Sequence, residues 1–311
     1  MASIPWQVGR SIGTIKGGYL TGVMRCIINR RAQFSASHRY YVSQWSEAEN
    51  FQRFGKGSLF PGHGHNYVLY VAMAGEIDDC GMVLNLSEVK HVIRREVTEP
   101  LDNAFLNQTW PEFGQTLPTT EFIAYAIWHR LRPHLPLARI QLYEHPQLWA
   151  EYQGDAMNAY LTVGTHFSAA HRLARVDFSE TENYTTYGKC ARPHGHGHNY
   201  HLEVTVRGEM HPVTGMLVDL VALQGVIERE VVEPLDHTFL NQDIPYFFEV
   251  VPTAEHIALY IVQLLREPIQ RLGAQLHKVK LVESPNNSCE IYADDVLTTA
   301  PVMPLTAAAS R

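Results

Sequence analysis

The sequence predicts an α+β protein built from two copies of one ββααββ module. Three observations support this prediction. His38, His63 and His65 recur 133 residues later as His171, His196 and His198. Each set is followed by the same order of strand-like and helix-like segments, and each first helix pattern ends in the same four letters, Glu-Pro-Leu-Asp. A chain of 311 residues with 45% hydrophobic content is long enough to bury two cores.

The repeat divides the chain into four predicted parts. Residues 25–154 form the first module, and residues 155–300 form the second. Residues 1–24 have no counterpart before the second copy and are expected to be an N-terminal extension. Residues 301–311 are expected to be a C-terminal tail.

Each module is predicted to begin with a long antiparallel hairpin. Residues 25–37 and 159–169 are rich in strand-forming types, and residues 66–74 and 199–206 alternate with the two-residue period of strands. A first helix follows, because apolar residues then recur at helical spacing in both copies. They are Leu86, Val89, Ile93 and Val97, mirrored by Leu220, Leu223, Ile227 and Val231.

The second half of each module is a helix followed by two strands. Thr119 and Thr253 open the second helices, since a threonine oxygen can accept from free amides there. Residues 139–143 and 149–152 are predicted as strands, as are residues 277–283 and 289–293. Two helices would then cover one face of a four-stranded antiparallel sheet whose edges are unpaired. We therefore expect a homo-oligomer formed edge to edge.

Composition limits the classes of partner. The net charge is −7 and no run of Lys and Arg appears, which argues against nucleic acid and against an anionic membrane surface. Cys26, Cys80, Cys190 and Cys289 make no close pairs. No signal peptide or long apolar span is visible, so we expect a cytoplasmic protein with free thiols.

The histidine pattern predicts a metal site in each module. Residues i and i+2 of a strand point to the same face, so His196 and His198 can converge on one ion while His171 arrives from the neighbouring strand. An isolated His-x-His would more often be two polar strand residues. The third histidine and the duplication favour zinc, with three ligands and an open fourth position. Because His38, His63 and His65 are also complete, about two zinc ions per chain are expected.

The two copies differ in residues that move protons. Cys190 stands five residues before the second histidine pair, and Gly57 takes its place in the first copy. Asp236 and His237 follow the first helix of the second copy, where the first copy has Asp102 and Asn103. A thiol and an imidazole can exchange protons near neutral pH, whereas glycine and asparagine cannot. Chemistry is therefore expected in the second copy.

These motifs resemble a known family. Ser-Ala-Ser-His at residues 35–38, Ser-Ala-Ala-His at 168–171, the two Gly-His-Gly-His-Asn-Tyr blocks and Leu-Asp-His at 235–237 are similar to the 6-pyruvoyl-tetrahydropterin synthase and 6-carboxytetrahydropterin synthase family. The resemblance runs from about residue 25 to 295 as two successive copies. It implies the tunnelling fold, in which three modules join their sheets into a twelve-stranded barrel and two such rings stack. Three tandem chains would supply six modules, and we expect rings segregated by copy.

The resemblance also implies roles for individual residues. Cys190 matches the general base, Asp236 and His237 match the pair that exchanges protons with the substrate side chain, and Glu283 matches the glutamate that anchors the pterin ring. Glu144 holds the equivalent place in the first copy, which could still bind a pterin. The implied enzyme is a zinc-dependent carbon–oxygen lyase. It would convert 7,8-dihydroneopterin triphosphate to 6-pyruvoyltetrahydropterin with loss of triphosphate.

Two alternatives remain open. The first is 6-carboxytetrahydropterin synthase of the queuosine and deazapurine pathway, whose cysteine usually lies nearer the histidine pair, with three intervening residues. Here five intervene, residues 191–195, as in the pyruvoyl branch. The second alternative is a non-catalytic pterin-binding or scaffold protein, suggested by the missing thiol and histidine of the first copy.

Overall fold

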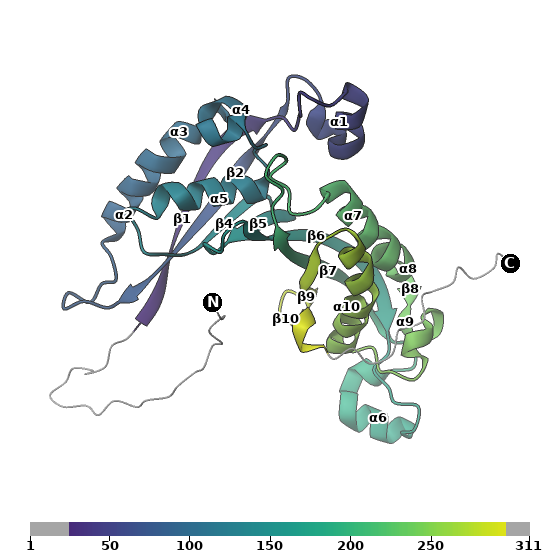
Figure 1. The fold of residues 1–311 in the computed structure, drawn as a ribbon. Coiled ribbons are helices and arrows are strands. Elements are labelled where there is room, and N and C mark those ends of the chain that lie inside the picture. The colour runs from purple at the N-terminus through teal and green to yellow at the C-terminus, as the bar shows by residue number, and fades with distance from the viewer. Residues whose placement is uncertain (1–24, 297–311) are drawn as a thin grey trace.

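The computed structural model describes residues 25–296, so the predictions for residues 1–24 and 301–311 lie outside the described part of the chain. Figure 1 shows two similar units joined through their strands, each with its main helices on one face of the sheet. The chain is thus a mixed α+β protein. No helix within residues 25–296 combines the length and apolar character needed to cross a membrane.

The first module has the predicted ββααββ order. Its hairpin is longer than expected, because the ladder of backbone hydrogen bonds runs from Arg25 opposite Glu76 to His38 opposite His63. A π-helical turn at Arg94–Thr98 joins α2 to α3 into one continuous helical rod. The main elements are β1 (Arg25–His38), β2 (His63–Glu76), α2 (Leu86–Ile93), α3 (Glu99–Leu101), α5 (Thr120–Leu131), β4 (Leu137–His145) and β5 (Leu148–Tyr152).

The second module repeats this order. Its elements are β6 (Asn158–His171), β7 (His196–Glu209), α7 (Leu220–Ile227), α8 (Glu233–Leu235), α10 (Ala254–Arg271), β9 (Gln275–Ser284) and β10 (Asn287–Tyr292). In both modules the core lies between helices and sheet, where Ile123 and Leu142 of the first module and Ile257 and Leu281 of the second are fully buried.

The helix starts follow the predicted chemistry. The side chains of Thr119 and Thr253 accept from the backbone amides of Phe122 and His256, which confirms both as N-caps. Asn85 and Asp219 do the same for the first helices, with Ser87 and Ala222 as their donors.

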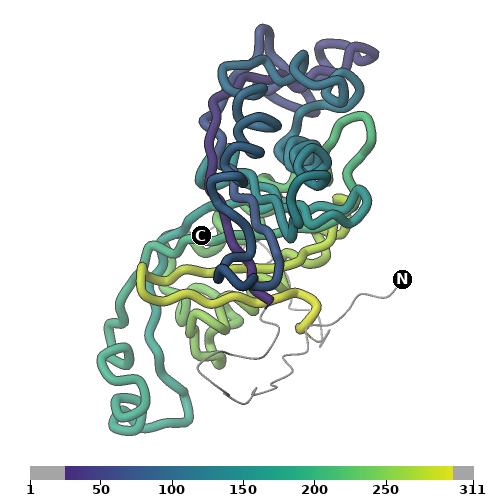
Figure 2. The backbone as a smooth tube through the Cα atoms, turned by 90° about the vertical axis from the view of Figure 1, so that its left-hand side faces the viewer, coloured from purple at the N-terminus to yellow at the C-terminus, as the bar shows by residue number. Residues whose placement is uncertain are grey.

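The loop between the two histidine strands contains elements that sequence analysis missed. In the first module it forms α1 (Glu47–Phe54) and a 3₁₀ turn at Gly55–Ser58; in the second it forms α6 (Glu180–Tyr187) and a 3₁₀ turn at Gly188–Ala191. Each helix begins with a capping box, Ser46 with Glu49 and Ser179 with Glu182. This Ser-x-x-Glu signal was visible in the sequence. Figure 2 shows α6 projecting from the end of the β6–β7 hairpin, away from the first module.

Several shorter elements follow the first helices. Two-residue strands, β3 (Ala104–Phe105) and β8 (Thr238–Phe239), pair in parallel with β1 and β6. The short helices α4 (Leu106–Thr109) and α9 (Leu240–Asp243) come next. The loops leading to α5 and α10 also contain 3₁₀ turns, at Pro111–Gly114 and Pro245–Phe248. These pieces bring the turns at Asn103 and His237 against β1 and β6, where their amides donate to the carbonyls of Ser35 and Ser168.

The two modules are joined edge to edge within one chain. β5 pairs antiparallel with β6, from Leu148 opposite Val163 to Glu151 opposite Tyr160, and the strands form one continuous sheet in the order β10-β9-β7-β6-β5-β4-β2-β1-β3. The prediction that every module edge is unpaired is therefore wrong for β5 and β6. The prediction of rings segregated by copy is also wrong, because the two copies are neighbours in the same sheet.

Further contacts hold this joint between the modules. Thr119 donates its hydroxyl to the carbonyl of Gly215 at 2.8 Å, and the amide of Leu217 donates to Glu121 at 3.2 Å. Gly215 has φ +67°, and a side chain there would come within 2.7 Å of the carbonyl oxygen of Leu117. Only glycine fits this close approach without strain.

Candidate metal and active site

Three histidines of the second module converge at the end of the β6–β7 hairpin. His171 lies opposite His196 in the ladder, and His198 is two residues further along the same face. The Nε2 atoms of His171 and His196 are 3.1 Å apart. The Nδ1 atom of His171 lies 2.7 Å from the carbonyl oxygen of Pro252, which holds the proton on Nδ1 and leaves the Nε2 lone pair free for a ligand.

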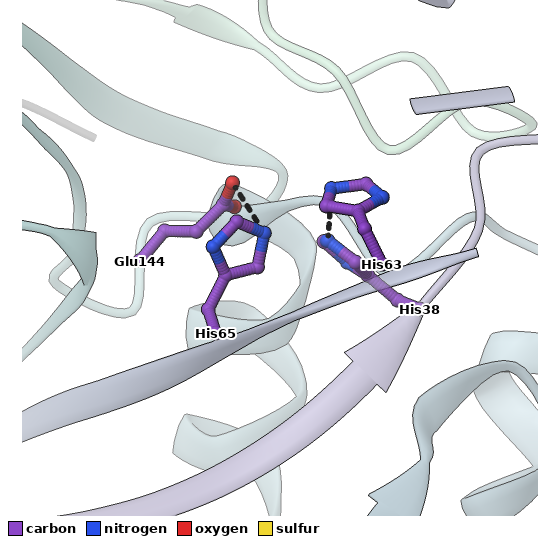
Figure 3. Close-up of side chains that lie close together, drawn as sticks. All are labelled: His38, His63, His65 and Glu144. Carbon is purple, nitrogen blue, oxygen red and sulfur yellow. Dashed lines mark hydrogen bonds and ion pairs between the residues drawn. The ribbon is translucent and has the colours of Figure 1, made fainter. Parts of the chain in front are cut away.

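The first module has the same cluster with one more member. Nε2 of His38 lies 3.1 Å from Nε2 of His63, and Nδ1 of His38 lies 3.0 Å from the carbonyl oxygen of Pro118. Glu144, from the end of β4, points its carboxylate at His65, with Oε1 and Nε2 3.2 Å apart (Figure 3). One ligand atom from each of these four residues lies within 4.8 Å of every other.

Both clusters fit a zinc-like ion. Ligand atoms at ~2.1 Å from a tetrahedral centre are about 3.4 Å from one another, close to the 3.1 Å spacing of the paired nitrogens. The Nε2 atoms of His65 and His198 are buried and make no hydrogen bond, as expected of atoms that serve as metal ligands. Burial lowers the pKa of His38 and of His171 to about 4, so both rings are neutral at pH 7, the form that binds metal.

Cys190 lies in the 3₁₀ turn that follows α6, where its side chain is half-buried. The turn is tied back to β6, because the amide of Leu173 donates to the carbonyl of Cys190 at 2.9 Å. The matching turn of the first module lies against the histidines, since a Cβ placed on Gly57 would be 3.6 Å from Cε1 of His63. By the repeat, we expect the Cβ of Cys190 to lie near the ring of His196, as a Cβ on Gly57 would lie near His63.

Asp236 and His237 form a hydrogen-bonded pair at the edge of β6. Nδ1 of His237 is 2.7 Å from Oδ2 of Asp236, and the other carboxylate oxygen accepts from the amide of Ser168 at 2.7 Å. These bonds, that from Ser168 first, lower the pKa of Asp236. The imidazole of His237 is 82% exposed, and the residue lines a shallow pocket of about 430 Å³ together with His198. Cys190 does not line this pocket.

The first module keeps the backbone of this turn without its histidine. Asn103 has φ +58°, and His237 has φ +57°. Both residues donate their amide to the matching carbonyl of the first strand, Ser35 or Ser168, at 2.6 Å. The difference between the copies at this position is therefore in the side chain alone.

The glutamates Glu144 of β4 and Glu283 of β9, which are equivalent in the repeat, lie at different distances from their histidines. Glu283 has Oε1 3.8 Å from Nε2 of His198 and 3.9 Å from Nε2 of His171, and it does not complete a four-residue group. Glu144 is closer to its histidines and is only 6% exposed. That the first copy could still bind a pterin stays a prediction.

Sequence analysis missed two residues that contact Glu144. Thr120 donates its hydroxyl to Oε2 of Glu144 at 2.5 Å, and the Tyr40 hydroxyl lies 3.4 Å from the same oxygen. Neither residue stands out by itself. Alignment of the two copies would have shown them, because the second module has Ala254 and Leu173 at these positions.

Comparison with known proteins agrees with the repeat. The family model described as 6-pyruvoyl tetrahydropterin synthase matches residues 27–155 and again residues 160–294. The 6-pyruvoyl tetrahydrobiopterin synthase of Homo sapiens is 46% identical over 134 residues, covering 43% of this chain and 91% of that protein. A putative 6-carboxy-5,6,7,8-tetrahydropterin synthase of Archaeoglobus fulgidus is 32% identical over 129 residues, covering 42% of this chain and 91% of that protein.

A solved structure is also similar to part of this chain. The Caenorhabditis elegans 6-pyruvoyl tetrahydropterin synthase matches with 35% identity and a TM-score of 0.42, covering 44% of this chain and 96% of that one. The Homo sapiens and Archaeoglobus fulgidus relatives each match a stretch about as long as one module. The family model covers most of the chain in two successive matches, and the chain belongs to the 6-pyruvoyl tetrahydropterin synthase family.

Proposed function

We propose that the second module is a zinc-dependent pterin synthase that converts 7,8-dihydroneopterin triphosphate to 6-pyruvoyltetrahydropterin with loss of triphosphate. The observation that carries this proposal is the contrast between the two modules. The second module combines an open three-histidine cluster, the thiol of Cys190 and the Asp236–His237 pair, whereas the first has glycine and asparagine at the matching positions. The relatives named above act on pterins by their names, which supports the substrate class.

The ring of the substrate would be held by Glu283. Its carboxylate lies at the end of β9 beside the histidine cluster. An ionised carboxylate accepts two parallel N–H bonds, and a pterin offers such a pair on its amino group and the adjacent ring nitrogen. This contact would direct the side chain of the substrate toward the histidines.

The proton transfers would be made by Cys190 and His237. His171, His196 and His198 would hold a zinc ion, whose Lewis acidity would make the C–H beside a hydroxyl of the substrate side chain easier to ionise. The thiolate of Cys190 would take that proton. His237 would return or relay protons, and Asp236 would hold its tautomer and support its charge. Elimination of triphosphate and tautomerisation of the side chain would then give the diketone.

The decisive experiment is incubation with 7,8-dihydroneopterin triphosphate, with products identified by mass. We expect 6-pyruvoyltetrahydropterin and triphosphate. Acetaldehyde released in proportion to substrate consumed would assign the 6-carboxytetrahydropterin reaction instead. Triphosphate alone does not discriminate, because both routes expel it. Unchanged substrate with metal-loaded protein would refute the proposed activity.

We also propose that two chains close into one ring, with β10 of each chain pairing with β1 of the other. The β5–β6 joint supports this as an internal template. By the repeat, Cys289 of β10 corresponds to Ala150 of β5, and Ile28 of β1 corresponds to Leu161 of β6. Ala150 and Leu161 face each other and are 0% and 2% exposed, whereas Ile28 and Cys289 are only partly buried.

The number of modules in such a ring must be even. Each chain contributes two consecutive modules to the same sheet, so a closed ring of whole chains cannot contain three. Two chains give the smallest ring, with four modules. Two edges support this proposal in the described chain: β10 pairs with β9 alone, and the outer side of β1 pairs with another strand only at Ala36 and Ser37.

A further inference from the structure

The two histidine clusters of this chain differ in the number of side chains that could bind a metal ion. We propose that the first module binds a divalent metal through four protein ligands, His38, His63, His65 and Glu144, and that this site is closed and structural. The proposal rests on the proposed metal but not on the proposed chemistry of the second module. A four-ligand site is the usual form of a structural zinc centre, and a three-ligand site with an open position is the catalytic form.

The carboxylate of Glu144 lies closer to its histidines than that of Glu283 does. Glu144 Oε1 is 3.2 Å from Nε2 of His65, a spacing that two ligands of one zinc ion adopt, while Glu283 stays 3.8 and 3.9 Å from its nearest histidine nitrogens. Figure 3 shows Glu144 and the three rings gathered around a common centre. Since the two modules share one fold, the second module serves as an internal reference for the first.

Two hydroxyl groups hold the carboxylate of Glu144 in place. Thr120 donates to its Oε2 at 2.5 Å and the Tyr40 hydroxyl lies 3.4 Å away, so Oε1 is the atom left to face the histidines. The matching residues of the second module are Ala254 and Leu173, which have no hydroxyl to donate. Hydrogen bonds to a ligating carboxylate orient it and tighten metal binding. The first module carries this support and the second does not.

The side chain of Tyr40 also crowds the first histidine cluster. A Cβ on Gly57, the position that Cys190 holds in the second module, would lie 3.0 Å from the Tyr40 ring. The ring also packs edge-on against His38, with centroids 4.6 Å apart. His38 is 0% exposed and Glu144 6% exposed, while His63 and His65 are only partly buried.

The test separates the two sites and probes whether each has an open position. His196→Ala should leave only the first site, and His63→Ala only the second. Each purified variant is loaded with cobalt(II), whose visible spectrum reports coordination, and titrated with azide as a small ligand. We expect one cobalt per chain in both variants. Azide should change the spectrum of the His63→Ala protein and leave that of the His196→Ala protein unchanged.

A pair of substitutions then tests the fourth ligand. In the His196→Ala background, Glu144→Gln should weaken metal binding by about 10- to 100-fold in a chelator competition, because the charged ligand and its support are lost. Glu283→Gln in the His63→Ala background is the matched variant and should leave affinity nearly unchanged. Tyr40→Leu with Thr120→Ala installs the residues of the second module and should make the first site respond to azide. Circular dichroism confirms that each variant is folded.

Three results would overturn the inference. The first is an azide response of the His196→Ala protein equal to that of the His63→Ala protein. The second is an equal loss of affinity from Glu144→Gln and Glu283→Gln. The third is a His196→Ala protein that is folded but takes up no cobalt. None of these readouts depends on turnover, so failure of the proposed synthase activity is distinguished from failure of this inference.

Discussion

Glu121→Gln should remove a pH dependence of stability that comes from one buried carboxyl group. Glu121 lies in the first turn of α5, is 4% exposed, and accepts the amide of Leu217 across the joint between the modules. Burial raises its pKa from the ordinary 4.5 to about 7, against the opposing effect of its backbone hydrogen bonds. Glutamine keeps an acceptor oxygen for Leu217 and carries no charge.

The sign and size follow from the pKa. Between about pH 4.5 and 7 the folded protein binds a proton at Glu121 that the unfolded chain releases, so the free energy of unfolding falls as pH rises through this window. A shift from 4.5 to about 7, at 1.36 kcal/mol for each pH unit, corresponds to about 3 kcal/mol. The variant lacks this loss. Its stability relative to the parent should therefore rise by about 3 kcal/mol from about pH 4.5 to about pH 8.

Urea unfolding at fixed protein concentration and fixed metal content measures this difference across the pH range. Glu255→Gln is the matched substitution, because Glu255 begins the equivalent helix α10 and backbone hydrogen bonding lowers its pKa. It should not produce a gain that grows with pH. Parallel pH profiles for the parent and Glu121→Gln would show that Glu121 is not held protonated by burial, and the reasoning would fail.

The remaining predictions concern catalysis and assembly. Cys190→Ala should lower turnover by about 10² or more while the metal stays bound, and near-normal rates would remove the thiol as base. Gly57→Cys should add little activity, because the Asn103 side chain cannot transfer a proton near neutral pH and Tyr40 occupies the adjacent space; a doubled rate would contradict this. His237→Asn copies the residue that the first module has at the same backbone angle, so it should keep stability and lose turnover by about 10²; retained turnover would exclude His237. Ile28→Cys should form a cross-link with Cys289 of a second chain under a short bis-alkylating reagent, and light scattering should give the mass of two chains; a monomer would refute the proposed ring.

Much of this architecture followed from residue patterns that act locally. The alternation of residue types along the hairpins, the threonine caps and the spacing of apolar residues each predicted an element that the structure contains, because strand and helix periods are properties of the backbone. The gathering of His171, His196 and His198 was likewise predictable, since a hairpin places i and i+2 residues beside a neighbour on the next strand. The short helices α1 and α6 were missed, although their capping boxes were present in the sequence.

Only the tertiary structure decided how the modules join and how the two histidine clusters differ in their distance to the neighbouring glutamate. The strand patterns marked β5 and β6 as edges but could not show that they pair with each other, because edge pairing depends on backbone groups that every strand presents. Glu144 and Glu283 have the same place in their modules. Neither residue by itself shows in the sequence that the two would lie at different distances from their histidines. Their different distances depend on Tyr40 and Thr120, which are far from Glu144 in the chain and reach it only after folding. Sequence thus determined the elements and the candidate ligand types, and side-chain packing determined how closely each glutamate approaches its histidines.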